Sequence, residues 1–423
     1  MIKQIFKIIW IERKTNTWIL LELILVFCIL WFCTDYLFFT AKRYFQPQGF
    51  DIEHTYRINI SAKDEGREVL GTGTDEDKNK MLEDIWTIYD RIKQYPAVEY
   101  ISFSQSAYPY SGSWSSTNIM QDSVAVNVQI KKVTPEFFSV FKINIISGIP
   151  FTWENSVAGR AVIVSADKDN LLGKQSPEKI QYINQDKDNK EDKENVIGVA
   201  NRSKRSEFEE YNAIAYYPLK KDNQFTARYR EICVRVKPEA YKNFSEQFTK
   251  DMRSQLELGH YYLSSVTSIE EDREGYMGWN GYSDNFKSIY SISTFLIINI
   301  FLGVVGTFWF RVQSRRSEIG LRIAMGSTKK GVKKMFISET FLLLLLASVV
   351  ASIICVNISI GDILKDINLP VPDRGEEGKI EIIQQFINYG ITFVFLAIIA
   401  FVAVWYPASK AAKIQPAAAL KDE

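Results

Sequence analysis

Residues 311–346 read RVQSRRSEIGLRIAMGSTKKGVKKMFISETFLLLLL, and they begin where one long apolar segment ends and run into the next. The polar part of this stretch contains a single acid, Glu318. Its cations are Arg311, Arg315, Arg316, Arg322, Lys329, Lys330, Lys333 and Lys334. A short cationic loop between two membrane spans is a strong orientation signal, and it predicts that this loop lies in the cytoplasm.

The first part of the loop is predicted to be a short helix. Ile319 and Ile323 are spaced to share one helical face. Glu318 and Arg322 form a favourable i,i+4 pair, with the acid on the N-terminal side. We call residues 311–335 the elbow.

The second part of the elbow is predicted to be another helix, separated from the first by a turn. Gly326 suits a left-handed helix end, and Ser327 or Thr328 can cap the helix that follows. Val332 and Phe336 lie on one stripe of this helix, which continues into apolar sequence. A helix–glycine–helix elbow next to a membrane span is suited to dock a cytoplasmic partner. The alternative is that its charges only set topology and contact lipid headgroups.

Working outward from the elbow, apolar runs of about 20 residues predict four membrane spans. The expected order is an amphipathic or simple flanking helix at the inner membrane face (1–17), a first span (18–40), an extracytoplasmic domain (41–288), a second span (289–310), the elbow (311–335), a third span (336–360), an outer loop (361–385), a fourth span (386–406) and a cytoplasmic tail (407–423). Both termini are then cytoplasmic, and the cationic loops satisfy the positive-inside rule. Glu22 and Asp35 lie near the two ends of the first span, where snorkelling or a partner on a neighbouring helix is favoured over an ion path.

The large polar region is predicted to be an α+β domain made of two β-α-β halves. In the first half a strand with His54, Tyr56, Ile58 and Ile60 in alternation is followed by a soluble linker (61–80), a helix (81–95) and a strand (97–105). The second half repeats the order with a strand (230–237), a helix (239–259) and a strand (261–269). A β-rich insert, about 106–228, splits the two halves.

Composition argues against several classes of function. The net charge of +1 lacks the concentrated basic face that nucleic-acid binding needs. Cys233 is the only cysteine outside the apolar runs, so the polar region has no disulfide framework. His54 and His260 have no neighbours at metal spacing and are interpreted as structural or surface residues. No phosphate-binding GxxxxGK[ST] loop, GxSxG elbow or HExxH motif is present, so no catalytic, cofactor-binding or metal site is predicted in this chain.

Three segments together resemble one protein family. The stretch around the elbow resembles the signature of FtsX-like permeases, which are the membrane subunits of MacB-type ABC transporters, through Arg316, Glu318, Ile319, Gly320, Arg322, Ala324, Gly326, Ser327 and Glu339. The tail YPASKAAKIQPAAALKDE resembles the closing segment of that family through Pro407, Ala408, Ala411, Ala412, Pro416, Ala417 and Leu420. The insert resembles the MacB-like periplasmic core domain through Phe137, Phe138, Phe141, Gly148, Phe151, Val164, Gly173, Gly198 and Val199.

The resemblance implies a permease subunit in the cell (inner) membrane that transmits ATP-driven movement to its outer domain. The implied partners are a separate ABC ATPase that binds the ATP, a second permease protomer, membrane lipid and, in some systems, a periplasmic adaptor. This chain departs from MacB itself, which has its ATPase fused at the N-terminus. The residues expected to contact the ATPase are Arg316, Glu318, Gly320, Arg322, Ala324, Gly326, Ser327 and Lys330. Two alternatives stay open: an FtsX-like mechanical regulator of an outer-side hydrolase, and a membrane-anchored sensor without an ATPase.

Overall fold

The computed structural model describes residues 11, 13–121, 124–154, 161–165, 182–184, 193–222, 225–228, 230–360 and 382–413. The chain divides into two compact units, which we call the membrane unit (Met1–Lys42 with Ser283–Glu423) and the outer unit (Arg43–Tyr282). Most of the expected helix 1–17, nearly all of the expected outer loop 361–385 and tail residues 414–423 lie outside the described residues.

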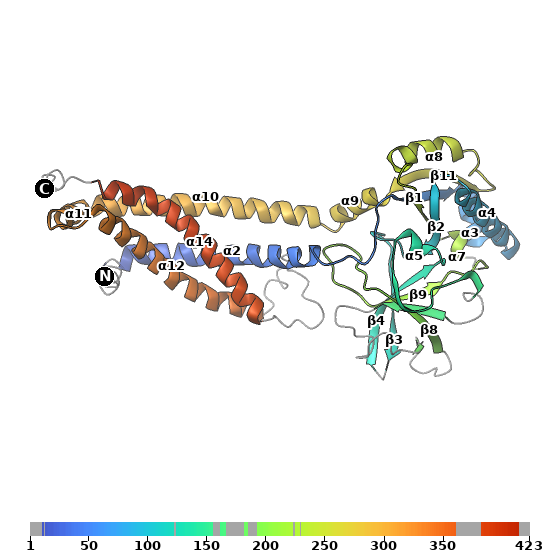
Figure 1. Ribbon diagram of the computed structural model, residues 1–423, viewed down its shortest axis with the longest axis horizontal. Helices are drawn as coiled ribbons and strands as arrows, with labels where there is room; N and C mark the ends of the chain where they lie inside the picture. The colour runs from blue at the N-terminus through green and yellow to red at the C-terminus, as the bar shows by residue number, and fades with distance from the viewer. Residues whose placement is uncertain are drawn as a thin grey trace. The chain divides into compact units, whose positions relative to one another are not determined.

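Four long helices make up most of the described membrane unit: α2 (Arg13–Tyr44), α10 (Tyr282–Ser314), α12 (Lys329–Ile360) and α14 (Ile382–Ala411) (Figure 1). Each contains a stretch that is long and apolar enough to cross a membrane. This confirms the predicted fold class, with four spans and a large α+β domain between the first and the second. The helices are longer than the expected spans because the polar residues that flank each apolar run continue the helix.

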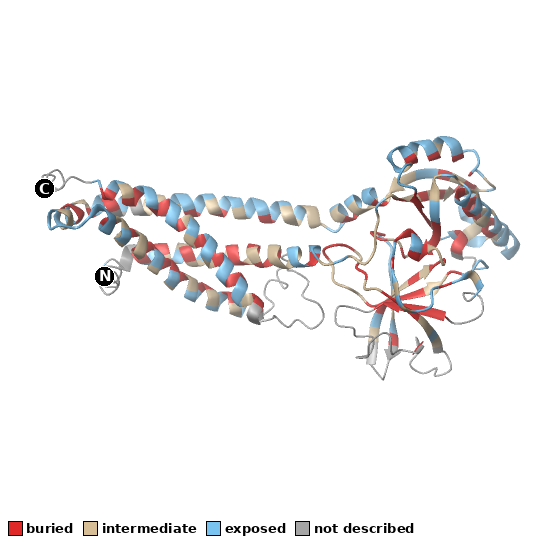
Figure 2. Ribbon diagram, in the orientation of Figure 1, coloured by how far each residue is buried: buried red, intermediate tan, exposed pale blue. Residues whose placement is uncertain are grey.

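The helices of the membrane unit pack around a shared apolar core and leave other apolar side chains exposed. Trp31, Phe336 and Leu396 are almost fully buried in that core. Phe295 and Ile353 are 65% and 60% exposed, as are other large apolar residues of these helices. Exposed positions recur along all four helices (Figure 2). In a protein with spans of this length, such exposed apolar faces are the surfaces that contact lipid.

The acid near the outer end of the first span has a partner on another helix. Asp35 is 4% exposed, and its Oδ1 accepts a hydrogen bond of 2.7 Å from Asn388 Nδ2 on α14. Gln384 Nε2 in turn donates to Asn388 Oδ1 at 3.1 Å. The expectation of a partner on a neighbouring helix is therefore confirmed for Asp35.

The outer unit contains a four-stranded antiparallel sheet built from two strand–helix–strand segments. The first segment is β1 (Thr55–Ala62), α3 (Asp64–Thr72), α4 (Asp75–Lys93) and β2 (Val98–Gln105); the second is β10 (Glu231–Val236), the short 3-10 helix η2 (Tyr241–Asn243), α8 (Phe244–Met252) and β11 (Tyr261–Ser268). The strand order is β11-β1-β10-β2, so each segment has a strand of the other inserted between its own two strands. This is a split β-α-β arrangement. Ile58 of β1 packs with Ile85 of α4 and Phe248 of α8 in its core.

Local details of the first segment differ from the sequence-based predictions. The expected linker contains α3 and the start of α4, because Thr74 Oγ1 caps α4 by accepting from the Asp77 N–H and acids follow in the first turn. His54 lies before β1 rather than in it. The Thr55 N–H bonds to the Ile52 carbonyl, and this turn places His54 at φ +58° with its ring stacked on Tyr241. The helix expected over 239–259 is shorter in the structure, where α8 covers Phe244–Met252.

The insert forms a closed ring of strands. Its elements are β3 (Ser115–Gln121), β4 (Val124–Val133), α5 (Phe137–Val140), β5 (Ile145–Gly148), β6 (Ala161–Ser165), β7 (Tyr182–Asn184), β8 (Lys193–Ala200), β9 (Ile214–Pro218) and α7 (Phe225–Arg228). Pairing runs β4-β3-β7-β8-β6-β9, and β9 pairs in parallel with β4. Val128, Val164 and Ile183 are fully buried together in one apolar cluster of these strands. The pairing of Ser104 with Val133 joins β2 to β4 and so connects the ring to the four-stranded sheet.

Candidate functional site

The first helix of the elbow is α11 (Arg316–Ala324), and it ends at a glycine in the left-handed conformation. Gly326 has φ +94°. Its N–H donates to the Ile323 carbonyl at 3.0 Å, and the Ser327 N–H donates to the Arg322 carbonyl at 2.9 Å. These two bonds are the Schellman pattern, in which glycine avoids the Cβ strain of positive φ. The predicted role of Gly326 as the helix end is confirmed.

The second helix of the elbow, the start of α12, is capped by Thr328. The Thr328 Oγ1 accepts a hydrogen bond of 3.1 Å from the Gly331 N–H, which would otherwise lack a partner in the first turn. Of the two expected caps, Thr328 is therefore the one that acts on this N–H.

One face of the elbow is packed into the membrane unit. Ile319 is 1% exposed, Val332 3% and Phe336 0%, and all three belong to the same buried cluster as the spans. Gly320 is also buried, and Ile323 packs against that cluster. The predicted apolar stripes of both helices are confirmed, and they hold the elbow against the membrane helices.

The opposite face of the elbow is exposed and partly apolar. Met325 is 80% exposed and Leu321 51%, and the two residues are four apart, so they are neighbours on the elbow surface. Arg322 Nη2 donates to Glu318 Oε1 at 2.6 Å, so the predicted i,i+4 pair is present. Of the other residues expected at this surface, Ala324, Gly326, Ser327 and Lys330 are exposed, Arg316 is half-buried and Gly320 is turned inward.

A buried ion pair joins the start of the elbow to α12, and sequence reasoning missed it. Arg315 Nη1 lies 3.1 Å from Glu339 Oε2, and the side chains are 7% and 1% exposed. The sequence-based interpretation counted Arg315 only among the cations that set topology. The available signal was Glu339 itself, an acid at the edge of an apolar run that needs a partner.

A second candidate element lies in the outer unit, in residues 201–211, which we call the junction loop. Phe208 of this loop contacts two tyrosine rings, stacked on one and tilted against the other. Its ring centroid is 5.8 Å from that of Tyr44, the last residue of α2, and 5.2 Å from that of Tyr282, the first residue of α10. Both tyrosines belong to the outer unit, so the junction loop contacts the first and the last residues of that unit.

Polar contacts join the junction loop to the last turn of α2 and to the segment that follows it. The Lys204 side chain is buried, and its Nζ donates to the Arg43 carbonyl at 2.6 Å. Burial, and then the nearby Arg43 guanidinium, lower the pKa of Lys204 to about 8. Arg43 donates at 2.7 Å to Glu210, and Tyr211 OH donates to the Pro47 carbonyl at 2.6 Å. Hydrogen bonds to Lys204, Glu210 and Tyr211 therefore hold this part of the chain to the junction loop.

The same loop binds the helix that leads into α10. Glu207 is fully buried and accepts hydrogen bonds from Arg273 Nε at 2.7 Å and from Tyr110 OH at 2.8 Å. Arg273 belongs to α9 (Ile269–Trp279), and Tyr276 of the same helix donates its hydroxyl hydrogen to Glu209. Local sequence carries no signal for the junction loop, because the partners of Glu207, Phe208 and Glu209 lie 66 or more residues away along the chain.

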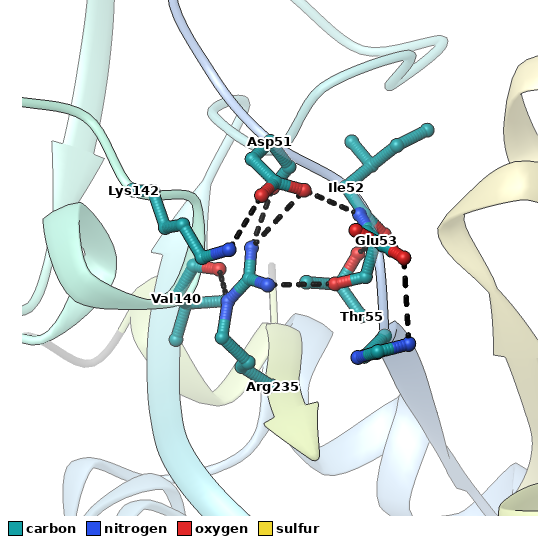
Figure 3. A network of polar contacts seen from close by, with 8 residues as sticks. Asp51, Ile52, Glu53, Thr55, Val140, Lys142 and Arg235 are labelled. Atoms are coloured by element: carbon teal, nitrogen blue, oxygen red, sulfur yellow. Dashed lines mark hydrogen bonds and ion pairs between the residues drawn. The ribbon is translucent and has the colours of Figure 1, made fainter. Parts of the chain in front are cut away.

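A further network fixes the segment after α2 to the core of the outer unit (Figure 3). The buried Arg235 guanidinium donates to the carbonyl oxygens of Val140, Glu53 and Asp51, each at 2.7 Å. Lys142 Nζ lies 2.6 Å from Asp51 Oδ2. Burial raises the pKa of Asp51, but hydrogen bonds from Lys142 and the Glu53 N–H and the Arg235 charge outweigh it and hold that pKa below its usual range. These hydrogen bonds tie the segment after α2 to β10.

Two known family models match this chain, one mainly in the outer unit and one in the membrane unit. Residues 37–250 match the model of the MacB-like periplasmic core domain, and residues 290–416 match the model of the FtsX-like permease C-terminal. The first match alone spans about half of the chain. The protein belongs to the MacB-like, FtsX-type permease family.

Individual relatives are distant. The ABC transporter permease YtrF of Bacillus subtilis (strain 168) is 25% identical over 242 residues, which are 54% of this chain and 52% of that protein. The chain therefore spans about half the length of this curated relative. Similar solved structures include the extracellular domain of the noncanonic ABC-type transporter YknZ from Gram-positive bacteria (17% identity, TM-score 0.31, 50% of this chain and 100% of that one). Another is the periplasmic region of MacB from Actinobacillus actinomycetemcomitans (13% identity, TM-score 0.34, 55% of this chain and 97% of that one).

Proposed function

We propose that this protein is the permease subunit of an ABC transporter and that it transmits movement of a separate ATPase to its outer unit. The observation that carries the proposal is the elbow, which has one face packed into the membrane helices and an exposed apolar face with Leu321 and Met325. A docked helix with an exposed apolar patch is suited to receive force from a soluble partner. ATP would be bound by that partner, because this chain contains no phosphate-binding loop.

The proposed path of transmission runs from the elbow through the spans to the junction loop. Arg315 and Glu339 connect the elbow to α12, while Phe208 contacts the ends of α2 and α10. A rearrangement is carried efficiently by elements that are packed and hydrogen-bonded rather than loosely linked. The assembly we propose has two permease protomers and two ATPase subunits, with both chain termini in the cytoplasm and the outer unit on the opposite side.

The first test is co-purification of the tagged, full-length protein with candidate ABC ATPases from the same genome. Met325→Glu places a charge on the exposed elbow face and should abolish the complex. Lys42→Gln makes the same change of charge at the far end of α2, on another exposed side chain, and should leave the complex intact. Absence of any ATPase in the wild-type sample, under every nucleotide condition, would favour the anchored-sensor alternative.

The second test separates binding from coupling. Gly326→Pro removes the N–H that bonds to Ile323 and replaces a φ of +94° with one near −65°. The variant should insert into the membrane at wild-type levels, yet lose the stimulation of ATP hydrolysis by the permease. Normal ATP-dependent function in this variant would refute the role of the elbow.

A further inference from the structure

A lysine at the elbow end of the membrane unit lies over two aromatic rings. Lys410 Nζ is 4.3 Å from the centroid of the Trp309 ring and 5.9 Å from that of the Tyr406 ring. The two rings are stacked, with centroids 6.1 Å apart and planes 8° from parallel. Trp309 belongs to α10 and the other two residues belong to α14, so this cluster bridges two spans.

The cluster lies at the same membrane face as the elbow. Trp309 is near the end of α10, just before the elbow, and Lys410 is in the last turn of α14. A second pair confirms this placement, because Lys333 in the first turns of α12 lies 5.2 Å from the ring of Trp405 on α14. Aromatic rings at the ends of spans lie at the level of the lipid headgroups.

The cluster is accessible from the lipid side of the helices. Tyr406 is 57% exposed and Trp405 51%, and Lys410 is exposed as well. These side chains therefore do not fill the core of the membrane unit. They form an outward-facing surface at headgroup depth.

The charge of the lysine has no counter-ion within the described part of the chain. Lys410 contacts only the two rings there. The two acids of the elbow region are already engaged, since Glu318 pairs with Arg322 and Glu339 with Arg315. An ammonium held over a ring directs its remaining N–H donors away from that ring, toward an external acceptor. At headgroup depth the abundant anionic acceptor is the lipid phosphate.

We propose that Lys410, Trp309 and Tyr406 form a binding site for the headgroup of an anionic phospholipid in the leaflet on the elbow side. The rings hold the ammonium in place and provide a flat apolar surface for the glycerol backbone and upper acyl chain. The site is formed by α10 and α14 and does not depend on an ATPase, so it stands apart from the proposed function.

The test uses the full-length protein, purified in detergent and mixed with equal amounts of phosphatidylglycerol and phosphatidylcholine. Native mass spectrometry would count the molecules of each lipid retained. The wild type should retain phosphatidylglycerol preferentially, and Lys410→Gln should lower that retention about fivefold. Lys410→Arg should behave like the wild type, because arginine keeps the charge and also stacks on aromatic rings.

Two further variants distinguish a built site from general basic charge. Trp309→Leu keeps the charge but removes the ring, and retention of phosphatidylglycerol should fall. Lys334→Gln is the matched control, because Lys334 is exposed on α12 and has no ring contact among the residues that the structure describes. Equal retention of the two lipids by the wild type, an equal loss in Lys334→Gln, or no loss in Trp309→Leu would each overturn the proposal. Displacement of the lipid by inorganic phosphate would also overturn it, since a soluble anion would then satisfy the site.

Discussion

At the scale of single residues, the buried pair of Arg315 and Glu339 should matter far more than the exposed pair of Glu318 and Arg322. Glu339→Gln keeps the shape of the side chain but leaves the Arg315 charge buried without its counter-charge, which costs about 3–5 kcal/mol in comparable cases. Glu318→Gln should change stability by no more than about 1 kcal/mol, because solvent screens that pair. Thermal unfolding of both full-length variants in the same detergent measures the difference. Similar losses in the two variants would contradict the assignment.

A buried lysine in the outer unit predicts a dependence of stability on pH. Lys131 on β4 is 7% exposed, and burial lowers its pKa to about 8; the Glu231 charge partly opposes this shift, and the Arg205 charge adds to it. An unfolded lysine has a pKa of about 10.4. Below about pH 8 the amine is protonated in both states, and the folded state bears the full cost of the buried charge. Between the two pKa values the unfolded chain binds more protons, so the contribution of Lys131 to stability rises with pH.

The variant Lys131→Met isolates this effect, because all other titrating groups are common to both proteins. The variant should be more stable than the wild type at about pH 7, and its advantage should shrink by about 1–2 kcal/mol on going to about pH 9.5. Hydrogen exchange of β4 and β9 in the full-length protein, compared at each pH, measures the advantage. A stability advantage that stays constant or grows with pH would show that burial does not lower the pKa of Lys131.

At the scale of elements, Phe208 should hold the junction loop to the first and the last residues of the outer unit. Phe208→Ala removes the ring that contacts Tyr44 and Tyr282, and buried phenylalanine truncations cost about 3–5 kcal/mol. Exchange protection should therefore fall in residues 201–211 and in the ends of α2 and α10, while the ring of strands keeps its protection. Tyr211→Phe is the matched control, because it removes only the hydrogen bond to the Pro47 carbonyl and should have a much smaller effect. A loss of protection confined to the junction loop would argue against the bridging role.

The elements also show which features could be predicted from sequence. The end of α11 and the cap of α12 were predictable, since Gly326 and Thr328 act on backbone groups within five residues of themselves. The junction loop was not, because Glu207 and Phe208 acquire their roles from partners far away in the chain. Polar composition also misled the interpretation of residues 61–80, where capping by Thr74 outweighs low hydrophobicity.

At the scale of the whole molecule, hydrophobic patterning was sufficient to predict the two units but not the closed ring of strands in the insert. The four apolar runs and the repeated strand–helix–strand order predicted a membrane unit and a split α+β unit, and the structure has both. The parallel pairing of β4 with β9 closes the ring of strands, and it joins segments about 80 residues apart. Period-2 alternation determines which face of a strand is buried, but it does not specify which distant strand becomes the partner.

If the elbow and the junction loop are the two ends of one path, variants at the two ends should fail differently. With a partner ATPase present, nucleotide should change the exchange protection of residues 201–211 in the wild type. Gly326→Pro should abolish both this change and the stimulation of ATP hydrolysis, because the force no longer enters the spans. Phe208→Ala should keep the complex and its ATP hydrolysis, yet lose the nucleotide-dependent change in the outer unit, because the force reaches α2 and α10 but is not passed on. The double variant should match Gly326→Pro alone, since a step upstream hides one downstream. If Phe208→Ala instead abolished ATPase binding, the two elements would not be ordered along one path, and the junction loop would be a fold-stabilising element only.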